Sequence, residues 1–246
     1  MTELVLREDV QGVATLTLNR PDALNALSPN LFVALRSHID AIAQSMETVG
    51  CVVLRGAGRS FSAGNDLKAI GRGEVAPTPT FQGETIEAIE ALPQPVIVSV
   101  RGHCYTGALE LVLAADLLVC SDTARFADTH GKWGMVPGWG MSQRLPRRVG
   151  LVKAKEMMFT ARVVGHEEAA AIGLANEWVP DAELDLRVNE LAASIVANSW
   201  HTLRGDKMLV RGGQDHPLSE GLAYERRENP GRSPQTEELV QGFTTR

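Results

Sequence analysis

The sequence places one carboxylate, Glu110, in the middle of an apolar stretch, TGALELVLAAD at residues 106–116. Burying an ionised carboxylate is costly unless the group is paired or its pKa rises. A helix that begins near Thr106 would leave the backbone amides around Gly107 without acceptors, and such amides attract anions. Glu110 follows Gly107 by three residues, so both face one side of that helix. The pattern predicts either a base beside an anion site or a residue that complements the helix dipole.

A second turn rich in small residues, RSFSAGNDL at residues 59–67, allows another backbone amide to approach a ligand. Two amides from separate turns can form an oxyanion hole, which stabilises an enolate or a tetrahedral oxyanion. Removing one donor of such a site typically lowers the rate by about 10²–10³. If the two turns meet, they form a catalytic device rather than a simple binding site.

The elements that must position these turns are short apolar strands that alternate with helices. Segments with the pattern of strands are residues 4–7, 13–18, 51–56, 95–102 and 117–122. Residues 9–12 have the composition of a hairpin turn, and Ser28 with Pro29 is typical of the start of a helix that includes residues 31–42. Strands that alternate with helices predict an α/β fold whose sites lie on the turns that follow the strands.

Two further regions complete the expected architecture. Residues 71–83 are rich in Gly, Pro and Thr, which predicts a mobile loop that is either an active-site lid or a plain surface connection. Beyond residue 167 the pattern is mostly helical, notably over residues 181–200 and 217–227. We therefore expect a core over residues 1–190 and a helical region over residues 191–246 that packs on the core or on a partner subunit.

Composition limits the class of protein. The 246 residues carry 24 Lys and Arg against 30 Asp and Glu, and a net charge of −6 does not favour nucleic acid or anionic lipid as a partner. Cys51, Cys104 and Cys120 are odd in number and lie among apolar residues, which predicts reduced core cysteines. The N-terminus lacks a signal-peptide pattern, and no run approaches the ~18 apolar residues of a membrane span. We expect a soluble, cytoplasmic protein.

Other clusters have simpler interpretations. The basic segment RLPRR at residues 144–148 is either a solvated surface turn or a holder of ligand phosphates. His103, Asp128 and His130 lack the compact spacing of metal ligands, so we expect no metal site. Trp133 and Trp139 are expected in the core or in a pocket wall.

Four motifs, in this order along the chain, resemble the enoyl-CoA hydratase/isomerase (crotonase) superfamily. They are NRPDALNA at residues 19–26, FSAGNDL at 61–67, the segment 95–116, and the segment 126–145 with PGWG at 137–140. The resemblance extends to about residue 180 and more loosely to the end. It implies a spiral of β-β-α units with a C-terminal helical trimerisation region, assembled as a homotrimer or a dimer of trimers. It also implies an acyl-CoA substrate. Coenzyme A is then part of the substrate, and no separate cofactor is expected.

The resemblance assigns roles to residues at matching positions. The backbone amides of Asn65 and Gly107 match the two oxyanion-hole donors. Glu110 matches the first of the hydratase's two catalytic glutamates, which positions and deprotonates water. Positions that match substrate- or CoA-contacting segments are Ala23, Leu24, Ala63, Asp66, Leu67, Gly138 and, more loosely, Phe243.

The most informative departure from the family pattern is His130. It lies four residues after Phe126, where two-glutamate hydratases have the second glutamate that protonates the α-carbon. Isomerase activity of the second-glutamate type is therefore not expected. Histidine can act as an acid or base near neutral pH, and in an extended segment Asp128 shares its face. Either His130 or Asp128 could transfer the proton at the α-carbon. Alternatively, His130 only fills space and Glu110 is the one catalytic acid or base.

These observations lead us to expect hydration of a trans-2-enoyl-CoA, or the reverse dehydration, through a thioester enolate. Gly138 stands where dehalogenase relatives have a nucleophilic aspartate, so covalent dehalogenation is not expected. Two alternatives stay open because of His130. One is a crotonase-fold acyl-CoA hydrolase or C–C bond lyase, and the other is a catalytically weak acyl-CoA-binding homologue.

Overall fold

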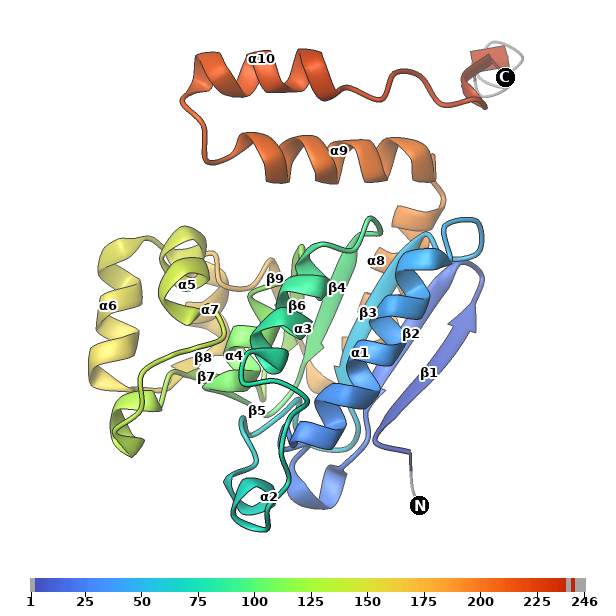
Figure 1. Ribbon diagram of the computed structural model, residues 1–246. Helices are drawn as coiled ribbons and strands as arrows, with labels where there is room; N and C mark the ends of the chain where they lie inside the picture. The colour runs from blue at the N-terminus through green and yellow to red at the C-terminus, as the bar shows by residue number, and fades with distance from the viewer. Residues whose placement is uncertain (1–2, 238–239, 242–246) are drawn as a thin grey trace.

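The computed structural model describes residues 3–237, 240 and 241, and it has an α/β fold with two sheets (Figure 1). The six-stranded sheet contains, in spatial order, β1 (Val5–Val10), β2 (Val13–Leu18), β3 (Cys51–Gly56), β4 (Val96–Val100), β6 (Leu117–Ser121) and β9 (Glu177–Val179). All neighbours in it are parallel except β1 and β2. The small sheet contains β5 (His103–Tyr105), β7 (Arg125–Ala127) and β8 (Val164–Gly165).

Helices cover both faces of the large sheet. The α-helices include, in chain order, α1 (Pro29–Gln44), α2 (Leu67–Gly71), α3 (Phe81–Glu90), α4 (Gly107–Val112), α5 (Met141–Val149), α6 (Leu151–Thr160), α7 (His166–Ala171), α8 (Leu184–Val196), α9 (Trp200–Gly213) and α10 (Leu218–Glu228). Alternate residues of β3 belong to two cores: Val52 and Leu54 pack with α1, α3 and α4, whereas Cys51 and Val53 pack with α8. This double burial explains why β3 reads as a continuous apolar run.

The chain winds as a spiral in which a strand of the large sheet is followed by a shorter β segment and then by a helix. This order is clearest in β4, β5 and α4. The shorter segments of successive turns pair with one another: Leu27 bridges Asn65, Ser62 bridges Cys104, and β5 pairs with β7. The pairing brings together turns that are far apart in the sequence.

Local sequence signals correctly located several elements. β1 and β2 form the predicted hairpin, and its turn residues Gln11 and Gly12 both have positive φ, as a type I′ hairpin turn requires. Ser28 caps α1, because its Oγ accepts a hydrogen bond of 3.2 Å from the Leu31 amide. The three cysteines are buried free thiols, as expected.

Other expectations need correction. The loop predicted over residues 71–83 is shorter, since Gly71 ends α2 and Phe81 begins α3. The basic segment at residues 144–148 lies within α5 rather than in a surface turn. There Arg144 binds Glu90 and Arg148 donates to the carbonyl of Ala115.

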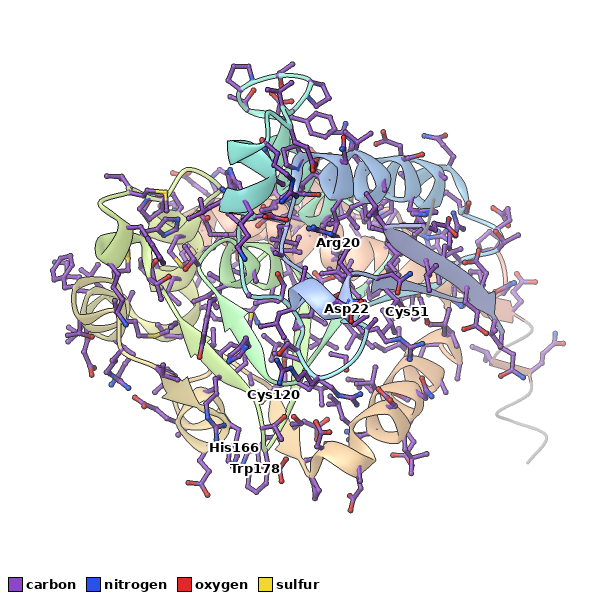
Figure 2. All side chains as sticks on the ribbon, turned by 90° about the horizontal axis from the view of Figure 1, so that it is seen from below. Arg20, Asp22, Cys51, Cys120, His166 and Trp178 are labelled. Atoms are coloured by element: carbon purple, nitrogen blue, oxygen red, sulfur yellow. The ribbon has the colours of Figure 1, made fainter. Side chains whose placement is uncertain are left out.

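Aromatic residues supply two further differences from the sequence prediction. Trp133 is 63% exposed and not part of the core. The edge strand β9 was not predicted, because it is short and only partly buried. Its Trp178 packs edge-to-face on His166 of α7, with ring centroids 4.6 Å apart (Figure 2), which ties this strand to the helix before it.

The last two helices extend beyond the sheet. α8 runs across residue 190 and packs on the sheet, whereas α9 and α10 lie side by side beyond the ends of its strands (Figure 1). The division into two units at residue 190 stays a prediction. No helix in the described ranges is both long and apolar enough to cross a membrane.

Candidate active site

The turn that follows β3 presents the backbone amide of Asn65. Leu27 donates its amide to Gly64 O (2.8 Å), and Asp66 donates to Leu27 O (3.1 Å). In this parallel bridge the amide of Asn65 points the other way, and it has no acceptor among the described residues. Gly64 has φ 96°, and a Cβ there would lie only 2.6 Å from the carbonyl oxygen of Tyr105. The position therefore requires glycine, and the contact sets this turn directly against the segment that leads into α4.

A second free amide belongs to Gly107, the first residue of α4. Its N–H also lacks an acceptor in the part of the chain that the structure describes. A Cβ at Gly107 would lie 2.3 Å from a ring carbon of Trp139, so glycine lets this aromatic ring lie over the turn. The Ser62–Cys104 bridge and the Gly64–Tyr105 contact bring the two predicted turns together.

Glu110 is 1% exposed, and the residues around the start of α5 bind its carboxylate. Its Oε1 accepts hydrogen bonds from the amides of Trp139 (2.8 Å) and Met141 (3.1 Å). Burial raises the pKa of Glu110, opposed by these two amides and by the neighbouring His130. The two amides and His130 partly offset the cost of burying this carboxylate, while its second oxygen, Oε2, has no backbone donor among the described residues.

His130 lies between Glu110 and Asp128. Its Nδ1 is 2.6 Å from Asp128 Oδ1, and its Nε2 is 3.7 Å from Glu110 Oε2. The short contact with Asp128 assigns a proton to Nδ1, and the ring then directs Nε2 toward Glu110. Burial opposes the charged imidazole, but the hydrogen bond and charge of Asp128, with the charge of Glu110, outweigh it and raise the pKa of His130.

Asp128 and His130 are in contact, but not through the shared face of an extended segment that the sequence predicts. The extended segment ends at Ala127, and residues His130–Trp133 form a short 3-10 helix. Asp128 Oδ1 accepts from the backbone amide of His130 (3.1 Å) as well as from its ring, so a local turn rather than a strand face brings the two together. Such turns depend on backbone geometry that alternation of residues does not reveal.

The positions expected to contact CoA come from two adjacent segments. Ala63 donates its amide to Leu24 O (2.9 Å), which joins the segment of Ala23 and Leu24 to that of Asp66 and Leu67. Asp66 pairs with Arg20 (2.8 Å; Arg20 is labelled in Figure 2) and also caps α2 by accepting from the Ala69 amide (2.9 Å). The pair and the cap fix the backbone directly after Asn65.

The remaining expected residues fall outside this cluster or outside the described ranges. Gly138 is exposed and adjoins Trp139, whose amide binds Glu110. Phe243 lies outside the described residues. His103 contacts Ser60 and Tyr105, not His130, and the described residues contain no group of His, Cys, Asp and Glu placed to hold a metal ion.

Two further residues of this site, Trp139 as a backbone donor and Met141, are not predicted by the sequence. The PGWG motif is the signal that could have found them, since glycines on both sides of Trp139 let its segment fold back onto Glu110. Nothing in the sequence alone singled out their amides, because any residue supplies an amide.

Residues 8–244 match the model of the family described as enoyl-CoA hydratase/isomerase. The chain belongs to this family. A relative is the short-chain-enoyl-CoA hydratase of Clostridium acetobutylicum, 34% identical over 230 residues that cover 90% of this chain and 86% of the relative. The family places the protein among acyl-CoA hydratases and isomerases, and it is an enoyl-CoA hydratase-like enzyme.

Solved structures of the enoyl-CoA hydratase/isomerase family confirm the expected crotonase-type fold. The enoyl-CoA hydratase from Bacillus anthracis superimposes with a TM-score of 0.92 at 30% identity, covering 98% of this chain and 96% of that one. A Thermobifida fusca protein solved in complex with acetoacetyl-CoA has a TM-score of 0.85 at 29% identity, with coverage of 97% and 96%.

Proposed function

We propose that this protein adds water to a trans-2-enoyl-CoA thioester, or catalyses the reverse dehydration. The observation that carries the proposal is the facing pair Glu110 Oε2 and His130 Nε2, 3.7 Å apart. On adjoining turns, the amides of Asn65 and Gly107 have no acceptor within the described residues. The pair supplies one base and one acid, and the amides supply donors for a developing oxyanion.

The thioester oxygen of the substrate accepts hydrogen bonds from the Asn65 and Gly107 amides. These bonds strengthen when the oxygen becomes an enolate, so they stabilise the transition state more than the ground state. The CoA chain runs along the joined segments that contain Ala23, Leu24, Ala63, Asp66 and Leu67, and Gly138 borders the acyl side. The relative solved with acetoacetyl-CoA supports a thioester ligand for this family fold.

Glu110 is the general base that deprotonates the water. Its Oε1 is committed to the amides of Trp139 and Met141, so Oε2 is the oxygen that accepts the water proton. As the water oxygen bonds to the β-carbon, the proton moves to Glu110 and the electron pair of the double bond moves onto the thioester oxygen. A raised pKa makes Glu110 a better base for this step than an ordinary carboxylate.

His130 supplies the second proton. The imidazolium Nε2 protonates the α-carbon as the enolate collapses, and Asp128 holds the ring by its Nδ1 proton. The proton taken up by Glu110 then returns to His130, with Nε2 and Oε2 as neighbours. Because both groups adjoin each other, they act on the same face of the double bond.

Steady-state assays with a short and a medium trans-2-enoyl-CoA test the proposal. We expect loss of the conjugated thioester absorbance and a product heavier by one water, identified by mass. Release of free CoA would instead indicate a hydrolase, and shortening of the carbon chain would indicate a C–C lyase. Tight binding without any product would indicate an acyl-CoA-binding homologue.

Gly64→Ala is expected to lower both stability and kcat. The new Cβ would collide with the Tyr105 carbonyl oxygen, and alanine would have to adopt a φ of 96°. The turn must therefore shift, and the Asn65 amide would move with it. We expect a loss of about 1–3 kcal/mol in the free energy of unfolding, measured by urea denaturation. The loss in kcat is expected to be about 10²–10³.

Gly73→Ala is the matched control for this variant. Gly73 also has positive φ, 87°, but a Cβ there would meet nothing within 4 Å. It should therefore lose stability through backbone strain alone and keep its kcat. A Gly64→Ala enzyme with wild-type kcat would show that the Asn65 amide does not hold the thioester oxygen.

The assembly and setting follow the family expectation. We propose a homotrimer or a dimer of trimers, supported by apolar residues that α9 and α10 leave exposed, namely Val210, Leu218 and Leu222. We further propose that the enzyme works in the cytoplasm and requires no cofactor beyond the coenzyme A of its substrate.

A further inference from the structure

Thr106, the residue directly before the Gly107 amide, has an unusual backbone conformation. Its φ is 53° and its ψ is −111°, a region that is readily open to glycine and unfavourable for a β-branched residue. Leu24 and Ala161 also have positive φ, but their ψ values of 38° and 31° place them in the ordinary left-handed region. A backbone of this kind costs about 1–3 kcal/mol, so the surrounding contacts must hold it in place.

Three hydrogen bonds hold Thr106 against a single segment. Its amide donates to Ala127 O (2.8 Å), its Oγ1 accepts from the Thr129 amide (3.2 Å), and its hydroxyl pairs with the hydroxyl of Thr129. Ala127 and Thr129 are the residues on either side of Asp128. Two of the three bonds use the Thr106 hydroxyl, which a glycine could not provide.

The buried hydroxyl therefore connects the two halves of the site. On one side of it is the Gly107 amide, which is covalently next in the chain. On the other side is the turn in which Asp128 holds His130 through both the ring and the backbone amide. A shift of residues 127–129 would move Asp128, and with it the His130 ring that faces Glu110.

We propose that Thr106 is a positioning residue, whose hydroxyl fixes the Asp128–His130 pair relative to the Gly107 amide. The inference rests on the proposed function, because the geometry it maintains lies between the oxyanion donor and the proton donor. The strained backbone at this position is retained because it directs the hydroxyl at Thr129.

Thr106→Gly and Thr106→Ser separate positioning from mere structural support. Glycine relieves the backbone strain and removes the hydroxyl, so we expect a stability equal to or above that of wild type. Its kcat for crotonyl-CoA hydration should fall tenfold or more, up to about 10², with KM within about twofold. Serine keeps the hydroxyl and should keep kcat within about threefold of wild type. A Thr106→Gly enzyme with wild-type kcat would overturn the proposal.

Thr129→Val controls for the added flexibility of glycine. Valine keeps the shape of Thr129 and its backbone amide but removes its hydroxyl, without touching the turn at Gly107. We expect a smaller fall in kcat than for Thr106→Gly. Because both changes break the same link, the double variant should be no slower than Thr106→Gly. Full additivity of the two effects would contradict the proposed link.

A spectroscopic readout makes the inference independent of turnover. The His130 Nδ1 proton, bonded to buried Asp128, should give a far-downfield proton resonance that Asp128→Asn abolishes. We expect the resonance in wild type and Thr106→Ser, and its loss by solvent exchange in Thr106→Gly. An unchanged resonance in Thr106→Gly, or none in wild type, would refute the positioning role. A wild type that shows the resonance but hydrates no enoyl-CoA would instead refute the proposed function alone.

Discussion

Glu110→Gln is expected to lower kcat for crotonyl-CoA hydration by about 10³, within the 10²–10⁴ that general acid–base catalysis typically contributes. Glutamine can direct its carbonyl oxygen at the Trp139 and Met141 amides, as Oε1 of the glutamate does. Its amide group would then occupy the place of Oε2, where it cannot accept a proton from water. The variant should therefore bind substrate and fail to activate water.

The stability of Glu110→Gln supplies the control for folding. Burial raises the pKa of Glu110, so the ionised carboxylate is disfavoured in the folded protein. Between the ordinary and the raised pKa the folded state binds more protons than the unfolded state, so this group makes stability decrease as pH rises. Above that range the neutral glutamine should leave the free energy of unfolding unchanged or higher. Retained hydration in a folded Glu110→Gln protein would exclude this glutamate as the base.

His130→Ala is expected to lower kcat by about 10², because no other side chain faces Glu110 Oε2 at a comparable place among the described residues. The measurement is steady-state hydration with the same substrates as for Glu110→Gln. Collapse in both variants supports the pair. Collapse in Glu110→Gln alone would make His130 a bystander and leave Glu110 to act by itself.

The pH dependence of kcat/KM tests the same assignment without deleting the ring. Hydration requires ionised Glu110 and protonated His130, so the rate should rise with pH through the raised pKa of Glu110 and fall through that of His130. Asp128→Asn removes a charge that raises the pKa of His130, so the alkaline limb should move to lower pH while the acid limb moves much less. An alkaline limb that stays in place would exclude His130 as the acid.

Sequence alone determined the local features of this protein. Ser28 and Pro29 marked the start of α1, and Gln11 with Gly12 marked the first hairpin, because caps and tight turns depend on neighbouring residues. The spacing of Gly107 and Glu110 placed both on one side of α4, because three residues make most of a helical turn. The sequence alone also showed that His130 stands where the family pattern has a second glutamate, because the residue type at a motif position can be read directly.

Tertiary structure decided how those features combine. The turns that carry Asn65 and Gly107 adjoin because successive turns of the spiral pair Ser62 with Cys104. Glu110 receives its two amide donors from a segment about thirty residues later in the chain. The link from Thr106 to Thr129 likewise depends on a backbone conformation that no propensity predicts for threonine. Each is a contact between distant segments, and only the folded backbone sets its distance and direction.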